Sequence, residues 1–285
     1  MAKLLVTGAT GFIGSHLVPK LRDHEHEVFA AHSRMGDIAD SSTWRAFPDA
    51  DIVIHLAGRT YVPDSWTDPI GFLRTNVHGT ICAADYCRER NARLIFISSY
   101  LYGVPEGIPI PENAALHANN PYALSKKLAE EACRFYSDYY GVNITILRSF
   151  NIYGPGQDAK FLIPSIVKQV LGGIVVKVKD LEPKRDYLYI DDLTDSFLSA
   201  IEKPQRFGIF NIASGTSHSV GEVIALVQKI AKKHLPVHSE GERRQEEVMD
   251  TRGDVSRARE VLGWRPRWSL SAGCARILQD KNSLI

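Results

Sequence analysis

The chain has 285 residues, of which 44% are hydrophobic and 24% are charged, a composition typical of a globular protein with a full core. It excludes a disordered chain, a collagen-like repeat and a disulfide-stapled miniprotein. The 34 basic and 33 acidic side chains give a formal net charge of +1, so no charge excess indicates binding to nucleic acid or to an anionic membrane. We therefore expect any anionic ligand to be bound by a local group of residues.

The cysteines form no CxxC pair, so we expect neither a disulfide framework nor a zinc site; they are Cys82, Cys87, Cys133 and Cys274. His234 and His238 have metal-like spacing, but Pro236 lies between them and we expect no metal there. The chain enters an apolar strand without signal-peptide features, and no run of 18 apolar residues occurs. We expect a cytoplasmic protein without a membrane span.

The first half of the chain alternates short apolar runs with amphipathic helical patterns. Strands are predicted over residues 4–7, 28–31, 52–56, 94–98 and 144–147. Helices are predicted over residues 11–22, 69–88 and 121–140, the last opened by Asn120 as N-cap and Pro121. Apolar strands separated by helices predict an α/β fold with a doubly wound parallel sheet covered on both faces.

After residue 150 this strict rhythm ends. Helices are predicted near 162–171, 191–201, 220–233, 254–262 and 270–278, and strands near 174–178 and 209–212. We expect a large domain of residues 1–150 plus about 184–213. A smaller C-terminal α+β cap would comprise about 151–183 and 214–285.

Three glycines at three-residue spacing, Gly8, Gly11 and Gly14, follow the first strand and open the first helix. The first glycine permits a tight turn, the second lets backbone amides approach a pyrophosphate, and the third lets the helix pack on the strand. A glycine triplet alone also occurs in plain turns, but the strand before it and the helix after it indicate a dinucleotide site.

The position about 20 residues after the last glycine selects between NAD and NADP, because an acid there binds the ribose and an Arg accommodates a 2′-phosphate. Arg34 occupies it, after Ser33, and this favours NADP(H) over NAD(H). The alternative is that Arg34 is a solvent-exposed loop residue that binds no phosphate. Asp37 and Ile38 would flank the adenine.

Tyr122 and Lys126 are four residues apart on one predicted helix and therefore share a face. A stripe on nearly the opposite face, Leu124, Leu128, Phe135 and Tyr139, would be buried. A cation close to a phenol lowers its pKa from about 10, and Lys126 is placed to do this. The alternative interpretation is that Tyr122 and Lys126 are an ordinary pair of surface residues without a catalytic role.

Ser98 ends a strand about two dozen residues earlier, at the edge of a parallel sheet where ligands bind. Its hydroxyl would donate to a carbonyl oxygen that gains negative charge during hydride transfer. Ser98, Tyr122 and Lys126 are thus the predicted catalytic residues.

Several motifs together carry a resemblance: TGATGFIG (7–14), HLAG (55–58), ISSYLYG (97–103), PYALSK (121–126), RSFNIYGPGQ (148–157), RDYLYIDDL (185–193), NIASG (211–215) and LGWRP (262–266). They resemble the extended short-chain dehydrogenase/reductases, in the nucleotide-sugar epimerase/dehydratase/reductase branch, over nearly the whole chain. Residues 55–69 resemble the GDP-4-keto-6-deoxy-D-mannose reductases most. The resemblance implies a Rossmann-type domain, a nucleotide-diphosphate sugar as substrate, and a homodimer formed through two long helices.

The same resemblance implies roles for further residues. Under the dinucleotide it places Gly8, Thr10, Gly11, Phe12, Ile13, Gly14, Leu56, Ala57, Gly58 and Asn76, with Tyr122 and Lys126 also touching it. Around the substrate it places Ser99, Tyr100, Asn151, Phe161, Leu162, Ile163, Arg185 and Arg244. Arginines suit the diphosphate because a guanidinium binds phosphate oxygens bidentately. Surface salt bridges are the alternative for Arg185 and Arg244.

Two departures from the family pattern limit the reactions that the resemblance allows. The 4,6-dehydratases carry Asp-Glu directly after the catalytic hydroxyl residue, and the GDP-fucose type of epimerase-reductase carries a Cys two positions after it; here Ser99 and Tyr100 follow. Reduction of a 4-keto-6-deoxy sugar at C4 is therefore favoured. An NDP-sugar 4-epimerase with tightly bound NAD is the alternative, and a non-catalytic NADP(H)-binding sensor or scaffold is the alternative outside enzymes.

Overall fold

The computed structural model describes residues 1–242 and 248–280. Its large sheet has six parallel strands in the order β2-β1-β3-β4-β5-β9. Their bounds are β1 Lys3–Thr7, β2 Glu27–Ala31, β3 Ile52–His55, β4 Arg93–Ser99, β5 Ile144–Ser149 and β9 Phe207–Ile212. The predicted doubly wound parallel sheet is confirmed. Because the chain turns from β2 back past β1 to β3, a ligand crevice is expected at the carboxyl ends of β1 and β3.

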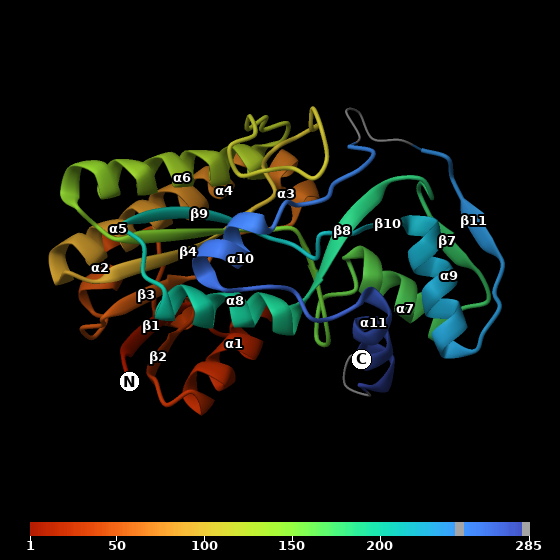
Figure 1. Ribbon diagram of the computed structural model, residues 1–285, viewed down its shortest axis with the longest axis horizontal. Coiled ribbons are helices and arrows are strands. Elements are labelled where there is room, and N and C mark those ends of the chain that lie inside the picture. Colours follow the sequence, from red (N-terminus) through yellow and green to blue (C-terminus); the bar gives the residue numbers. More distant parts are fainter. Residues whose placement is uncertain (243–247, 281–285) are drawn as a thin grey trace.

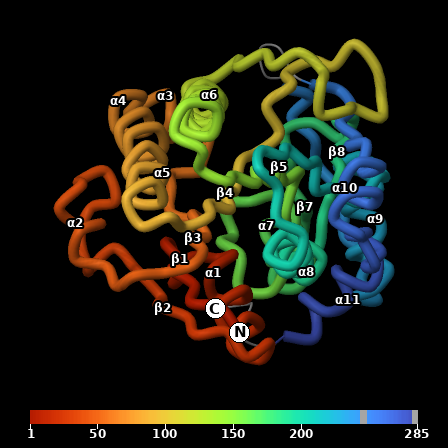
Figure 2. The backbone as a smooth tube through the Cα atoms, turned by 60° about the vertical axis from the view of Figure 1, so that its left-hand side comes forward, coloured from red at the N-terminus to blue at the C-terminus, as the bar shows by residue number. Residues whose placement is uncertain are grey.

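Helices cover both faces of this sheet (Figures 1 and 2). One face carries α1 (Phe12–Asp23) and α8 (Ile190–Glu202), and the other carries α2 (Ser41–Arg45), α3 (Val62–Thr67), α4 (Pro69–Leu73), α5 (Gly79–Arg90) and α6 (Pro121–Tyr140). Side chains of β4 alternate between the two layers: Ile97 packs in the cluster with α1 and α8, and Phe96 in the cluster with α5 and α6.

The helix predicted over 69–88 runs without a break from residue 69 to residue 90, but not all of it is α-helical. A π-turn, η2 (Arg74–His78), lies within it, between α4 and α5. Such insertions are frequent at functional sites. This π-turn contains Asn76, whose side chain is hydrogen-bonded to the backbone of Arg59 and to the hydroxyl of Ser125. The extra residue of the turn is therefore held by tertiary contacts, which the helical periodicity of the sequence does not encode.

The second half builds two small sheets beside the large one (right-hand side of Figure 1). One has the order β10-β8-β6, with β6 Asn151–Tyr153, β8 Lys184–Tyr189 and β10 Ser217–Ser219, and the other pairs β7 (Val176–Val178) with β11 (Val237–Ser239). Helices α7 (Leu162–Gly172), α9 (Val220–Ala231) and α11 (Leu270–Gln279) pack there, while α10 (Ser256–Leu262) contacts β9. Of residues 184–213, which we expected in the large domain, β9 extends the large sheet and α8 covers one of its faces, whereas β8 pairs in the small sheet.

Asp186 of β8 joins distant parts of this half. Its carboxylate is fully buried and accepts hydrogen bonds from the backbone N–H groups of Ser214, Gly215 and Gly253 at 2.7, 2.9 and 3.2 Å. Burial raises its pKa to about 6, against the lowering effect of these hydrogen bonds. Two loops, one after β9 and one before α10, are thereby fixed to one strand.

None of the helices in the described ranges is both long enough and apolar enough to cross a bilayer. No metal-binding group of three or more His, Cys, Asp or Glu occurs in those ranges either.

Candidate active site

The glycine loop between β1 and α1 has the geometry of a phosphate cradle. Gly8 has φ +69°, and a Cβ on it would lie 2.8 Å from the backbone N of Ala57. A Cβ on Gly14 would lie 2.7 Å from backbone carbons of Ala9. Gly11 is exposed, and a Cβ there would meet only the carbonyl oxygen of Gly8. Backbone atoms of the protein therefore crowd Gly8 and Gly14, whereas Gly11 is exposed on the other side of the loop. This arrangement fits a dinucleotide pyrophosphate at the start of α1.

The residues expected around the adenosine lie after β2 and beside the loop. Thr10, Ser33, Arg34 and Asp37 are exposed, whereas Phe12, Ile13 and Ile38 are half-buried. Asp37 forms an ion pair with Arg74 at 2.7 Å. The Arg34 guanidinium has no hydrogen bond or ion pair with any residue in 1–242 or 248–280, so it is available to a phosphate.

The end of β3 brings the cofactor loop close to Lys126. The hydroxyl of Thr7 lies 2.8 Å from Nδ1 of His55 and accepts the N–H of Ala57 at 3.2 Å, which ties β1 to the loop containing Leu56, Ala57 and Gly58. A Cβ on Gly58 would lie 3.7 Å from Nζ of Lys126. The ammonium therefore lies close to the backbone of Gly58.

Asn76 is 1% exposed and makes its hydrogen bonds to protein. Its Nδ2 donates to the carbonyl oxygen of Arg59 at 3.0 Å and to the hydroxyl of Ser125 at 2.8 Å, and its Oδ1 accepts the N–H of Arg59 at 2.8 Å. We assigned it to the cofactor; in this structure it joins the β3 loop to α6.

Tyr122 is in the first turn of α6, which begins as predicted, with the Asn120 side chain accepting the N–H of Ala123 at 2.8 Å. The Tyr122 ring is half-buried and packs edge-on against Phe72, with centroids 6.4 Å apart. Burial raises the pKa of its phenol, and a hydrogen bond with the hydroxyl of Ser99 lowers it in part. The phenol is therefore held in its protonated form.

Lys126 is 3% exposed, and its Nζ donates to the carbonyl oxygen of Ile97 at 2.9 Å and lies 4.6 Å from the centroid of the Phe96 ring. Burial lowers its pKa to about 8. Tyr122 and Lys126 do share a face, as predicted. The contact that lowers the phenol pKa comes from Ser99, and the effect of the ammonium on the phenol stays a prediction.

Ser98 is 2% exposed, and its Oγ has no hydrogen-bond partner among the described residues. A buried hydroxyl without a partner is costly and marks a place for one. The alternation of β4 puts Ser98 on the face of Phe96, toward α6. An oxygen of a bound molecule would satisfy it.

The residues expected to bind the substrate lie at the end of β4 or just after it, in β6 and β8, and at the start of α7. Tyr100 donates to the carbonyl oxygen of Gly103, and Asn151 donates to that of Asp186 at 3.2 Å. Arg185 donates to the carbonyl oxygen of Val248 at 2.5 Å, and its charge lowers the pKa of Tyr100 against the stronger effect of burial. Arg185 and Tyr100 are thus brought together.

The start of α7 is only partly available to a ligand. Phe161 and Leu162 are half-buried, but Ile163 is 2% exposed and packs in the main core. Phe161 lies edge-on to Tyr61, at 5.9 Å between centroids, and the Lys160 ammonium lies 4.9 Å from the Tyr61 ring. Sequence reasoning missed Tyr61 and Lys160, because nothing in the local pattern brings these two loops together. Arg244 lies outside the described residues.

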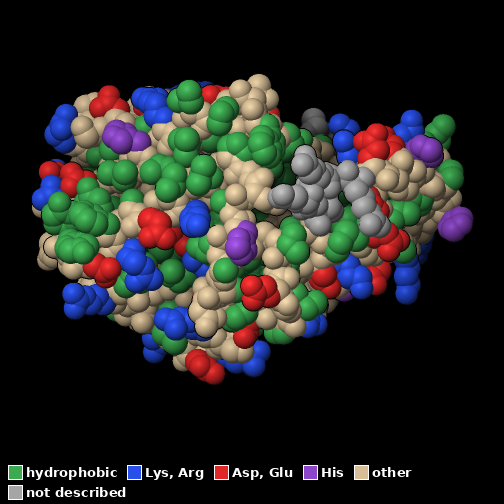
Figure 3. Space-filling model, turned by 90° about the horizontal axis from the view of Figure 1, so that it is seen from above, with side chains coloured by type: hydrophobic (Ala, Val, Ile, Leu, Met, Phe, Trp, Pro, Cys, Tyr) green, Lys and Arg blue, Asp and Glu red, His purple; other side chains and the backbone are tan. Residues whose placement is uncertain are grey.

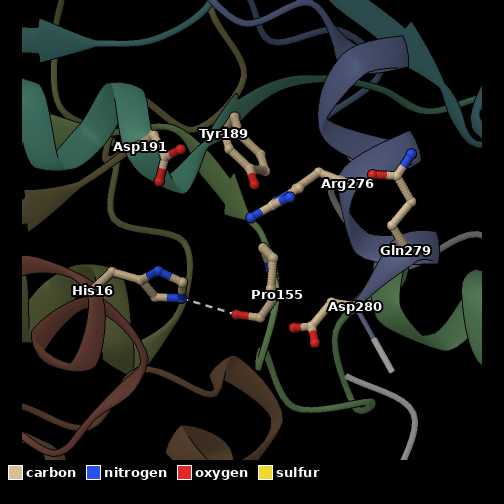
Figure 4. Close-up of a pocket in the computed structure, with 7 residues that line it drawn as sticks. All are labelled: His16, Pro155, Tyr189, Asp191, Arg276, Gln279 and Asp280. Carbon is tan, nitrogen blue, oxygen red and sulfur yellow. Dashed lines mark hydrogen bonds between the residues drawn. The ribbon is translucent and has the colours of Figure 1, made fainter. Parts of the chain in front are cut away.

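A separate cavity of about 460 Å³ lies on the α1 and α8 side of the sheet (Figure 4). Arg276 points into it between Tyr189 and Pro155, and Nε2 of His16 lies 2.9 Å from the Pro155 carbonyl oxygen. None of the residues predicted for cofactor or substrate lines it.

Comparisons with known proteins show the family of this chain. The model of the NAD dependent epimerase/dehydratase family matches residues 4–213. The chain is 31% identical to a GDP-6-deoxy-D-mannose reductase of Pseudomonas aeruginosa over 306 residues, with 99% of this chain and 98% of that protein covered. It is 30% identical to a putative UDP-glucose 4-epimerase of Methanocaldococcus jannaschii over 300 residues, covering 96% and 97%.

Among solved structures, RMD from Pseudomonas aeruginosa complexed with NADPH is similar over 100% of both chains, with a TM-score of 0.91 and 31% identity. The chain belongs to the NAD dependent epimerase/dehydratase family, and the expectation of an NAD(P)-dependent enzyme is confirmed.

Proposed function

We propose that the protein reduces the 4-keto group of a nucleotide-diphosphate 4-keto-6-deoxy sugar, with NADP(H) as the preferred cofactor. The observation that carries this proposal is the buried hydroxyl of Ser98 near the end of β4, which has no hydrogen-bond partner among the described residues, while the protonated phenol of Tyr122 contacts the adjacent Ser99. A reductase needs a proton donor and an oxygen-binding group side by side at the reacting carbonyl.

The dinucleotide, when bound in the glycine cradle, supplies the hydride. Tyr122 donates a proton to the oxygen at C4 while Ser98 donates a hydrogen bond to that oxygen. The phenol becomes a phenolate, which Ser99 and the ammonium of Lys126 stabilise until a proton returns from water. Ser99, Tyr100, Asn151, Phe161, Leu162 and Arg185 are proposed to contact the substrate, and Arg185 its diphosphate.

The exposed Arg34, without a partner in the described ranges, supports NADP(H). The full-length similarity to a protein named GDP-6-deoxy-D-mannose reductase supports a GDP sugar. A 4-epimerase that retains NAD is the second candidate, because a relative named as a putative UDP-glucose 4-epimerase is almost equally similar.

Cofactor turnover separates the two candidates. A reductase oxidises one NADPH for each GDP-4-keto-6-deoxy-mannose added, which the fall in NADPH absorbance measures. An epimerase copurifies with stoichiometric NAD, consumes no NADPH and interconverts UDP-glucose and UDP-galactose. Absence of NADPH oxidation with this keto sugar and with its UDP, CDP and dTDP counterparts contradicts the reductase proposal.

We further propose that the protein is a cytoplasmic homodimer. All four cysteines are free, which is compatible with a reducing compartment. The predicted stripe on α6 is not buried as expected: Leu124 and Leu128 are each 41% exposed, Phe135 is 49% and Tyr139 is 75% exposed. Hydrophobic side chains gather over this part of the surface in Figure 3. An exposed apolar stripe of this kind supports pairing with a second copy.

A further inference from the structure

A buried ion pair lies behind Lys126, between α6 and β5. The side chains of Glu130 and Arg148 are each 4% exposed. Nε of Arg148 lies 3.0 and 3.2 Å from the two carboxylate oxygens, and Nη2 donates to Oε2 at 2.6 Å. Burying two charges costs free energy that their attraction only partly offsets, so stability alone is a weak reason for such a pair.

The pair is aligned with the catalytic residues. Tyr122, Lys126 and Glu130 follow one another at four-residue spacing and so form one stripe along α6. Arg148 is the register partner of Ser98, since β4 and β5 pair those two residues. The carboxylate is thus one helical turn from the ammonium, and its guanidinium partner is next to the serine strand.

Among the described residues, Glu130 carries the negative charge that acts on Lys126. The other titratable groups near this ammonium are Cys133 of α6, which acts on it, and His55 of β3, on which it acts. Tyr122 shares its stripe on α6, and Arg148 of β5 brings a positive charge to Glu130. Burial raises the pKa of the Cys133 thiol and lowers that of His55 to about 3, so both are neutral near pH 7. The phenol is neutral as well, and β4 contributes Phe96 and Ser98, which do not ionise in this range.

The effect of this charge on Lys126 has a definite sign. Burial lowers the pKa of the Lys126 ammonium, whereas the Glu130 carboxylate raises it. Without the carboxylate, the ammonium would release its proton closer to neutral pH. A neutral amine could not stabilise a phenolate on Tyr122.

We propose that Glu130, fixed by Arg148, is a positioning residue whose buried negative charge keeps Lys126 as an ammonium throughout the working range of the enzyme. This inference rests on the proposed function, in which that ammonium stabilises the Tyr122 phenolate.

Arg148 has further partners that hold it in place. Its Nη1 donates to the hydroxyl of Tyr102 and to the carbonyl oxygen of Glu112, both at 2.9 Å. The Tyr102 hydroxyl donates to Oδ1 of Asn211 at 2.6 Å. Replacing Glu130 by Gln therefore leaves the guanidinium with hydrogen-bond acceptors and removes mainly the negative charge.

The first experiment is the pH profile of NADPH-dependent turnover in Glu130→Gln. Since reduction needs the ammonium, activity of the parent falls as the pH rises through the pKa of Lys126, at about 8. In Glu130→Gln this alkaline limb, the fall in activity at high pH, should lie about one pH unit lower. At a given alkaline pH, the fraction of Lys126 present as ammonium would then be about tenfold smaller. Asp138→Asn, a change to an exposed acid on the same helix, should leave the limb in place. An unmoved limb in Glu130→Gln overturns the proposal.

The second experiment uses the apoprotein and needs no substrate. Lys126 has a folded pKa of about 8 against 10.5 in a model peptide, so between these values the unfolded chain binds more protons. The free energy of unfolding should therefore rise with pH across this window, and Lys126→Met should remove the rise. In Glu130→Gln the rise should begin at lower pH. A window identical to that of the parent contradicts the proposal.

The two experiments distinguish this proposal from the proposed function. If the apoprotein window shifts but no keto sugar is reduced, the proposed function fails while the coupling of Glu130 to Lys126 holds. If Glu130→Gln does not fold, the double variant Glu130→Gln with Arg148→Met is compared with Arg148→Met alone, so that the two proteins differ only in the charge of residue 130. The alkaline limb and the apoprotein window of the double variant should then lie at lower pH, and identical values in the two proteins overturn the proposal.

Discussion

The side-chain amide of Asn76 donates a hydrogen bond of 2.8 Å to the hydroxyl of Ser125 and so joins the π-turn η2 to α6. The same side chain holds both backbone groups of Arg59. Asn76→Ala should leave these buried groups without partners, at about 1–3 kcal/mol for each group left unsatisfied. Denaturant unfolding would measure the loss.

Asn143→Ala is the matched control for Asn76, because the Asn143 side chain is exposed. Its unfolding midpoint should stay within error of the parent. An equally stable Asn76→Ala protein would mean that the hydrogen bonds by which Asn76 joins the β3 loop to α6 are not needed for stability.

Tyr122→Phe removes the proton donor and keeps the ring packed against Phe72. Turnover should fall by roughly 10²- to 10⁴-fold, the contribution typical of a general acid, while NADPH affinity changes little. Steady-state kinetics and a fluorescence titration with NADPH check the two halves. Tyr139→Phe, on a ring 75% exposed on the same helix, should be active. Retention of parental turnover in Tyr122→Phe would exclude the phenol as the acid.

Arg34→Ala should weaken NADPH binding by more than tenfold and NADH binding hardly at all, because only NADPH carries the 2′-phosphate that an exposed guanidinium can bind. Binding titrations with both dinucleotides measure the ratio. Arg45→Ala is the control, since Arg45 is exposed on α2 and contacts the hydroxyl of Ser41. Equal weakening of the two dinucleotides would remove the case for NADP(H).

Gly14→Ala tests the close packing of α1 on the loop. Its Cβ would lie 2.7 Å from two backbone carbons of Ala9, where no flexible side chain can move aside. The variant should unfold at lower temperature and lose dinucleotide binding, as scanning calorimetry with and without NADPH would show. Gly172→Ala, whose Cβ would meet no atom within 4 Å, should be at least as stable as the parent.

Leu128→Glu places a charge in the exposed apolar stripe of α6. If that stripe pairs with a second copy, the mass measured by light scattering should fall from that of a dimer to that of one chain. Ile174→Glu, which alters an 85% exposed apolar side chain far from α6, should keep the dimer mass. A parent protein that scatters as a single chain contradicts the homodimer proposal outright.

The sequence predicted the elements whose signals are local. The α6 bounds agree with the prediction at both ends, because Asn120-Pro121 and Gly141 are strong start and stop signals. The strands of the large sheet were found from their apolar runs. The strands β6, β8 and β10 were missed, since they are short, partly polar and formed only by pairing with segments far away in the sequence.

Features of the site that depend on tertiary packing were not predictable in the same way. Periodicity located the α6 stripe but assigned it to the core, because an apolar face has the same spacing whether it packs inside a chain or lies exposed. The motif placed Tyr122 beside Lys126, yet the phenol contacts Ser99 and the ammonium contacts a β4 carbonyl. Neither contact follows from spacing along one helix.

Asp186 has a consequence for how the molecule is completed during synthesis. Its carboxylate takes donors from residues 214, 215 and 253, and residue 253 also pairs with Ile110 in the loop that follows β4. The small sheets can therefore reach their final form only after Gly253, 67 residues beyond Asp186, has been synthesised. A chain that ends before Gly253 still contains every strand of the large sheet but leaves a buried acid short of one donor, so premature termination there should leave the second half incompletely assembled.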